Sequence, residues 1–246
     1  MSASKEPVKA SRPRPLLAPL APLGRALLDL VYPPLCLHCA DRLPPAAPLP
    51  LCQACRRRLP RAEPVALDGR LADFPGGPAA FDRRFALWTF DRSGPLQHLQ
   101  HALKYGNRPG LGVALGRVVG EALGPGSCGI DAVVPVPLAK RRRLERGYNQ
   151  SERLASGVAD VLGVPVRADW LRREKPTRSQ TALSKRQRWE NVHDAFAGPA
   201  PGTLAGRHVL LVDDVFTTGA TVAAAARPLR TAGARLSLAV LACTRA

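Results

Sequence analysis

The 246-residue sequence lacks any apolar run of the roughly 18–20 residues that a helix needs to cross a bilayer. Its most apolar early segment, residues 16–31, is interrupted by two prolines and by Arg25 and Asp29. No clean small-residue cleavage site follows the basic N-terminus, so this segment does not read as a signal peptide. We therefore predict no transmembrane segment and a cytoplasmic protein.

Acidic residues are scarce, with 19 Asp and Glu against 36 Lys and Arg, which leaves a formal net charge of +17. Such a surface attracts polyanions, including nucleic acid, nucleotides and diphosphates. Aromatic residues make up only 5% of the chain, which leaves few platforms on which the bases of a single strand can stack. Glycine and proline show no three-residue period, which excludes a collagen.

Cysteines are few, but four of the six form the pattern C-x2-C-x12-C-x2-C, namely Cys36, Cys39, Cys52 and Cys55. Two such knuckles, close in sequence, predict one structural Zn2+ held by four thiolates. A pair of disulfides is the alternative, but it needs an oxidising compartment. Four thiolates leave no open coordination position, so we expect no catalysis at this metal. The remaining cysteines, Cys128 and Cys243, are expected to be small buried residues.

The role of the zinc module is a separate question with two answers. The module either holds its own loops together or forms a surface that contacts nucleic acid or protein. Three consecutive arginines at 56–58 follow the last ligand and favour the contact surface.

Apolar periodicity predicts helices over 21–32, 94–105, 110–123, 148–162 and 220–232, and strands over 85–90, 132–136, 164–171, 209–212 and 236–242. Strands that alternate with helices predict an α/β fold with a parallel sheet covered on both faces. We expect a disordered tail over 1–20, a helix plus four-Cys module over 21–62, a linker and first strand over 63–92, and the α/β domain over 93–246.

The sequence HVLLVDDVFTTGATV at 208–222 carries the clearest chemical signal. An apolar strand ends in Asp213 and Asp214, and a turn of small and hydroxyl-bearing residues leads into a helix. Ligands of open α/β sheets bind beyond the carboxyl ends of the strands. The turn offers backbone N–H groups, hydroxyls and a helix N-terminus, which together suit a monophosphate.

Adjacent carboxylates would repel phosphates, but they accept hydrogen bonds from vicinal ribose hydroxyls and can hold Mg2+ directly or through water. The pattern therefore predicts a ribose 5-phosphate site. No lysine follows the glycine as in a Walker A loop, and the dinucleotide pattern G-x-G-x-x-G is missing.

The segment V-L-L-V-D-D-V-F-T-T-G-A-T resembles the phosphoribosyl pyrophosphate (PRPP) binding signature of type I phosphoribosyltransferases. Together with the four-Cys knuckle and R-G-Y-N-Q at Arg146–Gln150, it resembles the ComF family of competence or amidophosphoribosyltransferase-like proteins. The resemblance extends from about Leu35 to Ala242. It implies a type I phosphoribosyltransferase-like parallel sheet flanked by helices and preceded by a small zinc-knuckle module.

The resemblance also implies roles for individual residues. The ribose hydroxyls would be bound by the catalytic carboxylates Asp213 and Asp214. The 5-phosphate would be held by Thr217, Thr218, Gly219, Ala220 and Thr221. The diphosphate and a flexible lid over residues 172–188 would involve Lys140, Arg141, Arg178 and Arg188.

The implied activity is a PRPP- and Mg2+-dependent transferase of the glycosyltransferase class, linked to DNA uptake in natural competence. The acceptor is not named by any residue, although a hood over 93–125 is a candidate place for it. The alternative is a non-catalytic protein that binds single-stranded DNA with the same scaffold and zinc module. Other proteins of the competence machinery are candidate partners. His98 and His101 are expected to lie at the surface or to be partly packed.

Overall fold

A computed structural model describes residues 33–45, 47–124, 129–175 and 185–245, without the side chains of Lys185, Arg186 and Arg188. The expected tail over 1–20 and helix over 21–32 lie outside the described residues, as does Cys128. Among the described helices, none has both the length and the apolar character that a membrane crossing requires.

A four-stranded parallel sheet forms the centre of the molecule, in the order β1-β6-β5-β2. Its strands are β1 (Arg83–Phe90), β2 (Ala132–Pro135), β5 (His208–Phe216) and β6 (Arg235–Thr244). The apolar stretches of β5 and β6 are buried because helices cover both faces of the sheet. The predicted α/β fold with a parallel sheet is confirmed.

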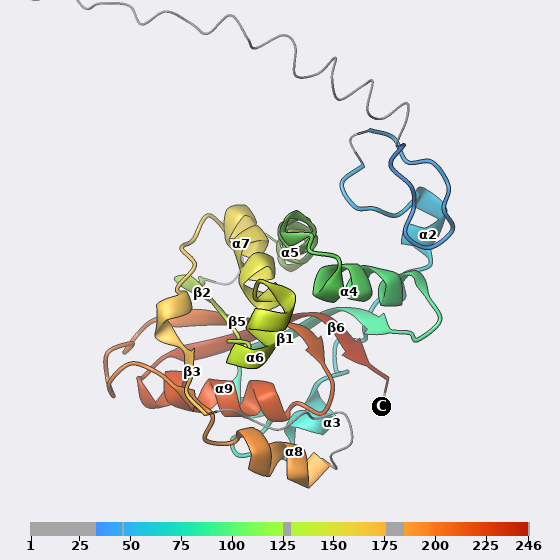
Figure 1. Cartoon of the computed structure of the whole chain (residues 1–246). Coiled ribbons are helices and arrows are strands. Elements are labelled where there is room, and N and C mark those ends of the chain that lie inside the picture. Colours follow the sequence, from blue (N-terminus) through green and yellow to red (C-terminus); the bar gives the residue numbers. More distant parts are fainter. Residues whose placement is uncertain (1–32, 46, 125–128, 176–184, 246) are drawn as a thin grey trace, which may run out of the picture.

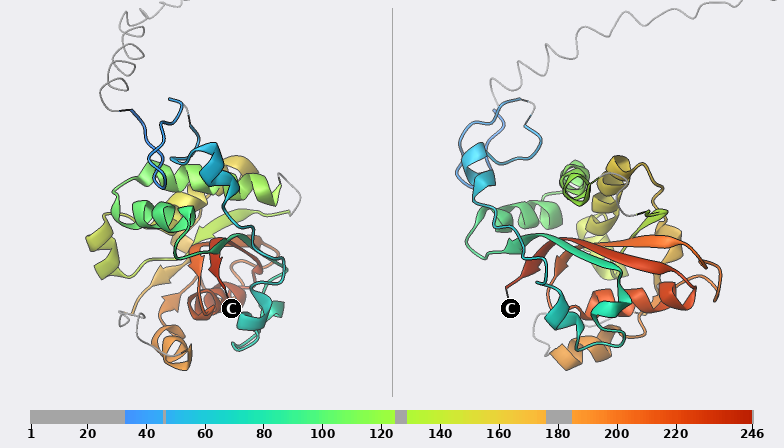
Figure 2. Two further views of the ribbon diagram at one scale, coloured as in Figure 1. Left: turned by 90° about the vertical axis from the view of Figure 1, so that its right-hand side faces the viewer. Right: turned by 180° about the vertical axis from the view of Figure 1, so that it is seen from behind.

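Two sets of helices cover the two faces, as Figures 1 and 2 show. One face carries α4 (Pro95–Tyr105), α5 (Pro109–Leu123) and α7 (Gln150–Leu162), with the four-Cys module and its helix α2 (Gln53–Arg57) beyond α4. The other carries α3 (Asp68–Leu71), α8 (Lys185–Val192) and α9 (Ala220–Thr231). The short helix α6 (Lys140–Arg146) follows β2. The remaining elements are η1 (Pro78–Ala80), η2 (Ala168–Trp170) and the antiparallel pair β3 (Arg172–Arg173) and β4 (Phe196–Ala197).

Glycines allow α5 and α7 to pack backbone against backbone. A Cβ at Gly116 would lie 2.1 Å from the carbonyl oxygen of Leu154, and one at Gly157 would lie 2.0 Å from that of Val113. Any side chain at either position would push the helices apart. This close crossing fixes α7, whose first turn reaches the functional site.

Three expectations about the connections differ from the structure. In place of a strand over 164–171, only Val166 bridges to β2 before η2 begins, and the neighbouring Pro165 has no N–H to extend the pairing. The stretch 172–188, where the resemblance implies a flexible lid, contains β3 and the first half of α8. The stretch 63–92, expected to be a linker and first strand, also contains α3 and packs Leu71 and Phe74 into the core beneath the sheet.

Candidate functional site

The site lies where the chain leaves β2 and β5 in opposite directions. From β2 the chain passes through α7 to the bridge at Val166 on the outer side of β2, whereas from β5 it passes through α9 to β6. The two helices cover opposite faces, so the carboxyl ends of β2 and β5 open a crevice between them. A pocket of about 490 Å3 occupies this crevice.

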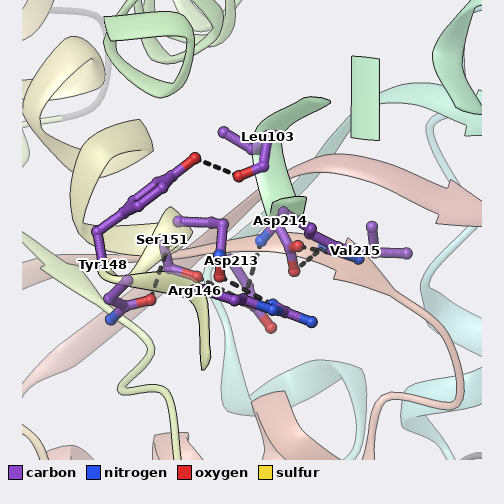
Figure 3. Close-up of polar contacts among 10 residues, drawn as sticks. Leu103, Arg146, Tyr148, Ser151, Asp213, Asp214 and Val215 are labelled. Atoms are coloured by element: carbon purple, nitrogen blue, oxygen red, sulfur yellow. Dashed lines mark hydrogen bonds and ion pairs between the residues drawn. The ribbon is translucent and has the colours of Figure 1, made fainter. Parts of the chain in front are cut away.

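The adjacent carboxylates of β5 line this pocket and are held by a fixed set of donors (Figure 3). Asp213 Oδ1 accepts hydrogen bonds from Ser151 Oγ at 2.8 Å and from the backbone N–H of Asp214 at 2.9 Å. Asp214 Oδ1 accepts from the backbone N–H of Val215 at 2.8 Å, and its Oδ2 lies 3.2 Å from Lys104 Nζ. Both carboxyl groups are therefore oriented before any ligand arrives.

The two carboxyl groups have opposite pKa shifts. Burial and the neighbouring charge of Asp214 raise the pKa of Asp213 to about 7, although Ser151 partly opposes this. Burial also acts to raise the pKa of Asp214, but the Lys104 ammonium outweighs it and lowers that pKa below its usual range. The pair thus holds one firmly ionised carboxylate and one that titrates near neutral pH.

The turn between β5 and α9 forms the pocket wall next to these carboxylates. Thr217 and Thr221 line the pocket, while the Ala220 side chain is buried in the core, so only its backbone can face a ligand. Gly219 has φ +90°, and a Cβ there would lie 2.9 Å from Phe216 Cζ. Glycine is therefore required both for the left-handed backbone and for the space.

Among the residues that the structure describes, five cationic side chains from three elements of the fold surround the carboxylates. They are Lys104, Arg141, Arg142, Arg146 and Arg173. The diphosphate contact expected at Arg141 is at the pocket, but Lys140 is exposed and lies outside the lining, because the first turn of α6 points it to solvent. Arg178 falls outside the described residues, and the side chain of Arg188 is not described.

Several residues of the site were not predicted from the sequence. Ser151 and Gln150 begin α7 and line the pocket, directly after the R-G-Y-N motif. The Gln150 side chain accepts from Arg146 Nη1 at 3.0 Å, while its buried Nε2 has no hydrogen-bond acceptor among the described residues. Periodicity predicted the helix α7 itself, and the run R-G-Y-N-Q is the signal that could have marked its first residues as part of the site.

The four predicted zinc ligands converge. All four Sγ atoms lie within 4.8 Å of one another, and those of Cys39 and Cys52 are 3.5 Å apart. Tetrahedral zinc with bonds of about 2.3 Å separates its sulfurs by about 3.8 Å. Although burial opposes ionisation, hydrogen bonds from the backbone of Cys39 and Cys52 lower the pKa of Cys36 to about 6, whereas burial raises the pKa of Cys55. The cluster therefore fits a zinc ion in the number, type and spacing of its ligands.

Comparisons with known proteins agree with this geometry. Residues 149–246 match the family model of the phosphoribosyl transferase domain. The DNA utilization protein YhgH of Salmonella typhi is 38% identical over 149 residues, which cover 58% of this chain and 65% of that protein. Competence protein F of Haemophilus influenzae is 36% identical over 42% of this chain and 45% of its own length. Competence protein ComFC of Bacillus subtilis is 34% identical over 43% of this chain and 41% of its own length.

The chain carries a phosphoribosyl transferase domain and is a relative of the ComF competence proteins. The resemblance drawn from the sequence is thus confirmed. The matched residues 149–246 of this ComF relative include β5, both carboxylates and the turn into α9, but they begin after α4 and the four-Cys module. The assignment of individual site residues stays a prediction.

Proposed function

We propose that this ComF relative binds PRPP with Mg2+ in the pocket between β2 and β5, and transfers or recognises its ribose 5-phosphate group. The observation that carries the proposal is the juxtaposition of Asp213 and Asp214 with the hydroxyl-bearing turn at Thr217–Thr221. Carboxylates suit the ribose hydroxyls, and the turn with the N-terminus of α9 suits the 5-phosphate.

The cations of the pocket would bind the diphosphate. Arg141, Arg142 and Arg173 line the same pocket as the carboxylates. In a transfer reaction, loss of pyrophosphate from C1 of PRPP builds positive charge on the ribose ring and negative charge on the leaving group. Guanidinium groups beside the leaving group would stabilise its negative charge. Such chemistry needs no nucleophilic serine or cysteine.

The donor set of the pocket fits Mg2+. Asp213 and Asp214 supply carboxylate oxygens at the pocket wall, and Mg2+ prefers one or two carboxylates together with water and substrate phosphates. These two residues would hold the ion directly or through water. When bound, the ion would neutralise the charge of the diphosphate.

Calorimetric titration of the zinc-loaded protein with PRPP in Mg2+ tests this proposal. We expect saturable binding that disappears when Asp213→Asn and Asp214→Asn are combined, with the melting curve showing that the variant still folds. Asp160→Asn is the matched control, because Asp160 is half-exposed and pairs with Arg117 away from the pocket. Binding that the double variant leaves unchanged would remove the ribose assignment.

Single-stranded DNA binding is the second candidate function. Exposed arginines at 56–58 on the four-Cys module and at 141 and 143 on α6 favour it. So do the names of relatives that refer to DNA utilization and competence. In this role the chain would act in DNA uptake, together with other proteins of the competence machinery.

A salt series tests this second function. Binding of an oligonucleotide through lysine and arginine weakens steeply with salt. Neutralising Arg141, Arg142 and Arg143 should weaken single-strand binding and flatten its salt slope. An unchanged slope would mean that this cluster is only a solvated surface.

A further inference from the structure

Helix α4 connects the four-Cys module to the pocket. At its carboxyl end, Lys104 reaches Asp214. The preceding carbonyl of Leu103 accepts a hydrogen bond from the hydroxyl of Tyr148 (Figure 3). Tyr148 belongs to the segment between α6 and α7. The position of Lys104 in the pocket is therefore set by where α4 lies.

The other half of α4 lies against the four-Cys module. In the sequence, His38 stands between the first two predicted zinc ligands. Its Nδ1 lies 3.4 Å from His98 Nδ1, and its Nε2 lies 3.5 Å from Arg58 Nη1. Because arginine only donates, this arrangement makes His38 Nδ1 the donor and His98 Nδ1 the acceptor. His98 precedes Lys104 by six residues, about 9 Å along the helix axis.

Apolar contacts also link the four-Cys module to α4. The buried leucines of the module and those of α4 form one continuous hydrophobic cluster, which contains Leu43, Leu49, Leu51, Leu59, Leu96, Leu99 and Leu103. The zinc-binding loops are thus part of the core that α4 packs on. They do not form a separate domain that a linker joins to the rest of the chain.

The buried side chain of Gln100, in the middle of α4, destabilises the packed position of this helix. Gln100 is only 4% exposed, and neither atom of its amide has a hydrogen-bond partner among the described residues. Burial of an unsatisfied polar group is unfavourable, because its hydrogen bonds to water are lost and not replaced. The position of α4 therefore depends on its apolar face and on the contacts of His98 and Leu103.

We propose that the metal-loaded four-Cys module positions Lys104 through α4, so that ligand binding in the pocket depends on zinc occupancy. This inference rests on the proposed function, and it assigns the zinc a role beyond holding its own loops. Because coupling between two binding sites is reciprocal, a pocket ligand must raise the zinc affinity by the same factor by which zinc raises the ligand affinity.

The first test measures PRPP affinity in Mg2+ before and after removal of zinc with a zinc-selective chelator. We expect the dissociation constant to rise about tenfold on zinc removal. Saturating PRPP should in turn raise the affinity for zinc about tenfold, measured by competition with a chromophoric chelator. In Lys104→Met the affinity should already be reduced, and zinc removal should change it less than twofold. An equal zinc effect in both proteins would overturn the route through Lys104.

A second test perturbs the contact without touching a zinc ligand. His98→Leu should keep the full zinc content but weaken PRPP binding about threefold. His98→Asn should restore most of the affinity, because its amide oxygen can accept from His38 in place of Nδ1. Gln97→Leu, on an exposed neighbouring position of the same helix, is the control. Equal effects of the leucine and asparagine variants at 98 would overturn the role of the hydrogen bond.

A third measurement needs no pocket ligand. Amide hydrogen exchange should speed up along α4 as far as Tyr105 when zinc is removed, while α9 keeps its protection. Absence of PRPP binding in the zinc-loaded protein would defeat the proposed function and leave this exchange result to decide the coupling. Equal amide exchange rates in α4 with and without zinc would overturn the inference.

Discussion

Arg70 of α3 donates a hydrogen bond from Nη1 to the carbonyl oxygen of Thr217, 147 positions later in the chain, at 2.6 Å. The same guanidinium donates to the hydroxyl and the carbonyl oxygen of Thr244, and it lies over the ring of Phe216. One side chain thus ties the turn beside the carboxylates to the end of β6. The turn owes its shape to this bridge as well as to Gly219.

Replacing Arg70 by lysine should therefore loosen the turn. Lysine keeps the charge but loses the planar fork that serves Thr217 and Thr244 together. We expect PRPP affinity to fall about tenfold while the fold survives, measured by calorimetry and a thermal melt. Arg117→Lys, in an exposed ion pair with Asp160, is the matched control. Equal affinities of the two variants would contradict a positioning role for Arg70.

The raised pKa of Asp213, about 7, predicts a pH-dependent stability. Below about pH 4 the carboxyl is protonated in both the folded and the unfolded chain. Between about pH 4 and 7 the unfolded chain ionises first, so this group lowers stability as pH rises, by up to roughly 4 kcal/mol. Above pH 7 both states are ionised and the loss stays constant.

Asp213→Asn isolates this contribution, because the amide oxygen can still accept from Ser151 but cannot ionise. The variant should match the wild type near pH 4 and become progressively more stable than it up to pH 7. Denaturant unfolding at several pH values measures the difference between the two free energies of unfolding. A difference that is independent of pH would show that Asp213 does not titrate in this range.

The sequence predicted those parts of the site that are local in the chain. Strand, carboxylates and turn lie within residues 208–222, so their pattern could be read directly. Arg70 and Lys104 were missed because their partners are far away in sequence, and nothing in a Pro- and Gly-rich stretch or an amphipathic helix marks a single charged residue. Lys140 was favoured over Arg142 by position alone, since the sequence does not give the rotation of a short helix.

The rotation of α6 about its axis places Arg142 and Lys140 differently, so variants at these two positions form a matched pair. Arg142 is half-buried in the pocket lining, whereas the neighbouring Lys140 two residues earlier is exposed and outside it. Arg142→Gln should weaken PRPP binding at least tenfold, and Lys140→Gln should change it less than twofold, although each removes one positive charge. Equal losses would mean that the pocket senses overall charge and not a specific contact.

The four-Cys cluster predicts about one zinc per chain, measured by elemental analysis of the purified protein. Cys52→Ser removes one of four converging ligands and should lose most of the metal and part of the stability, since the module shares its core with α4. Cys243→Ser is the control, because this buried cysteine lies in β6 outside the cluster. Full zinc content in the Cys52 variant would refute the four-Cys site.

Gln100 provides the last prediction. Its amide is buried without a partner among the described residues, in a cluster of leucines on α4. Gln100→Met has a similar volume and length and removes both unsatisfied groups, so it should stabilise the fold by about 1–2 kcal/mol. Gln100→Glu should destabilise it, because it buries a group that prefers to ionise. Thermal and denaturant unfolding measure both changes. A methionine variant less stable than the wild type would show that the amide is satisfied in solution. Gln100 would then not oppose the position of α4.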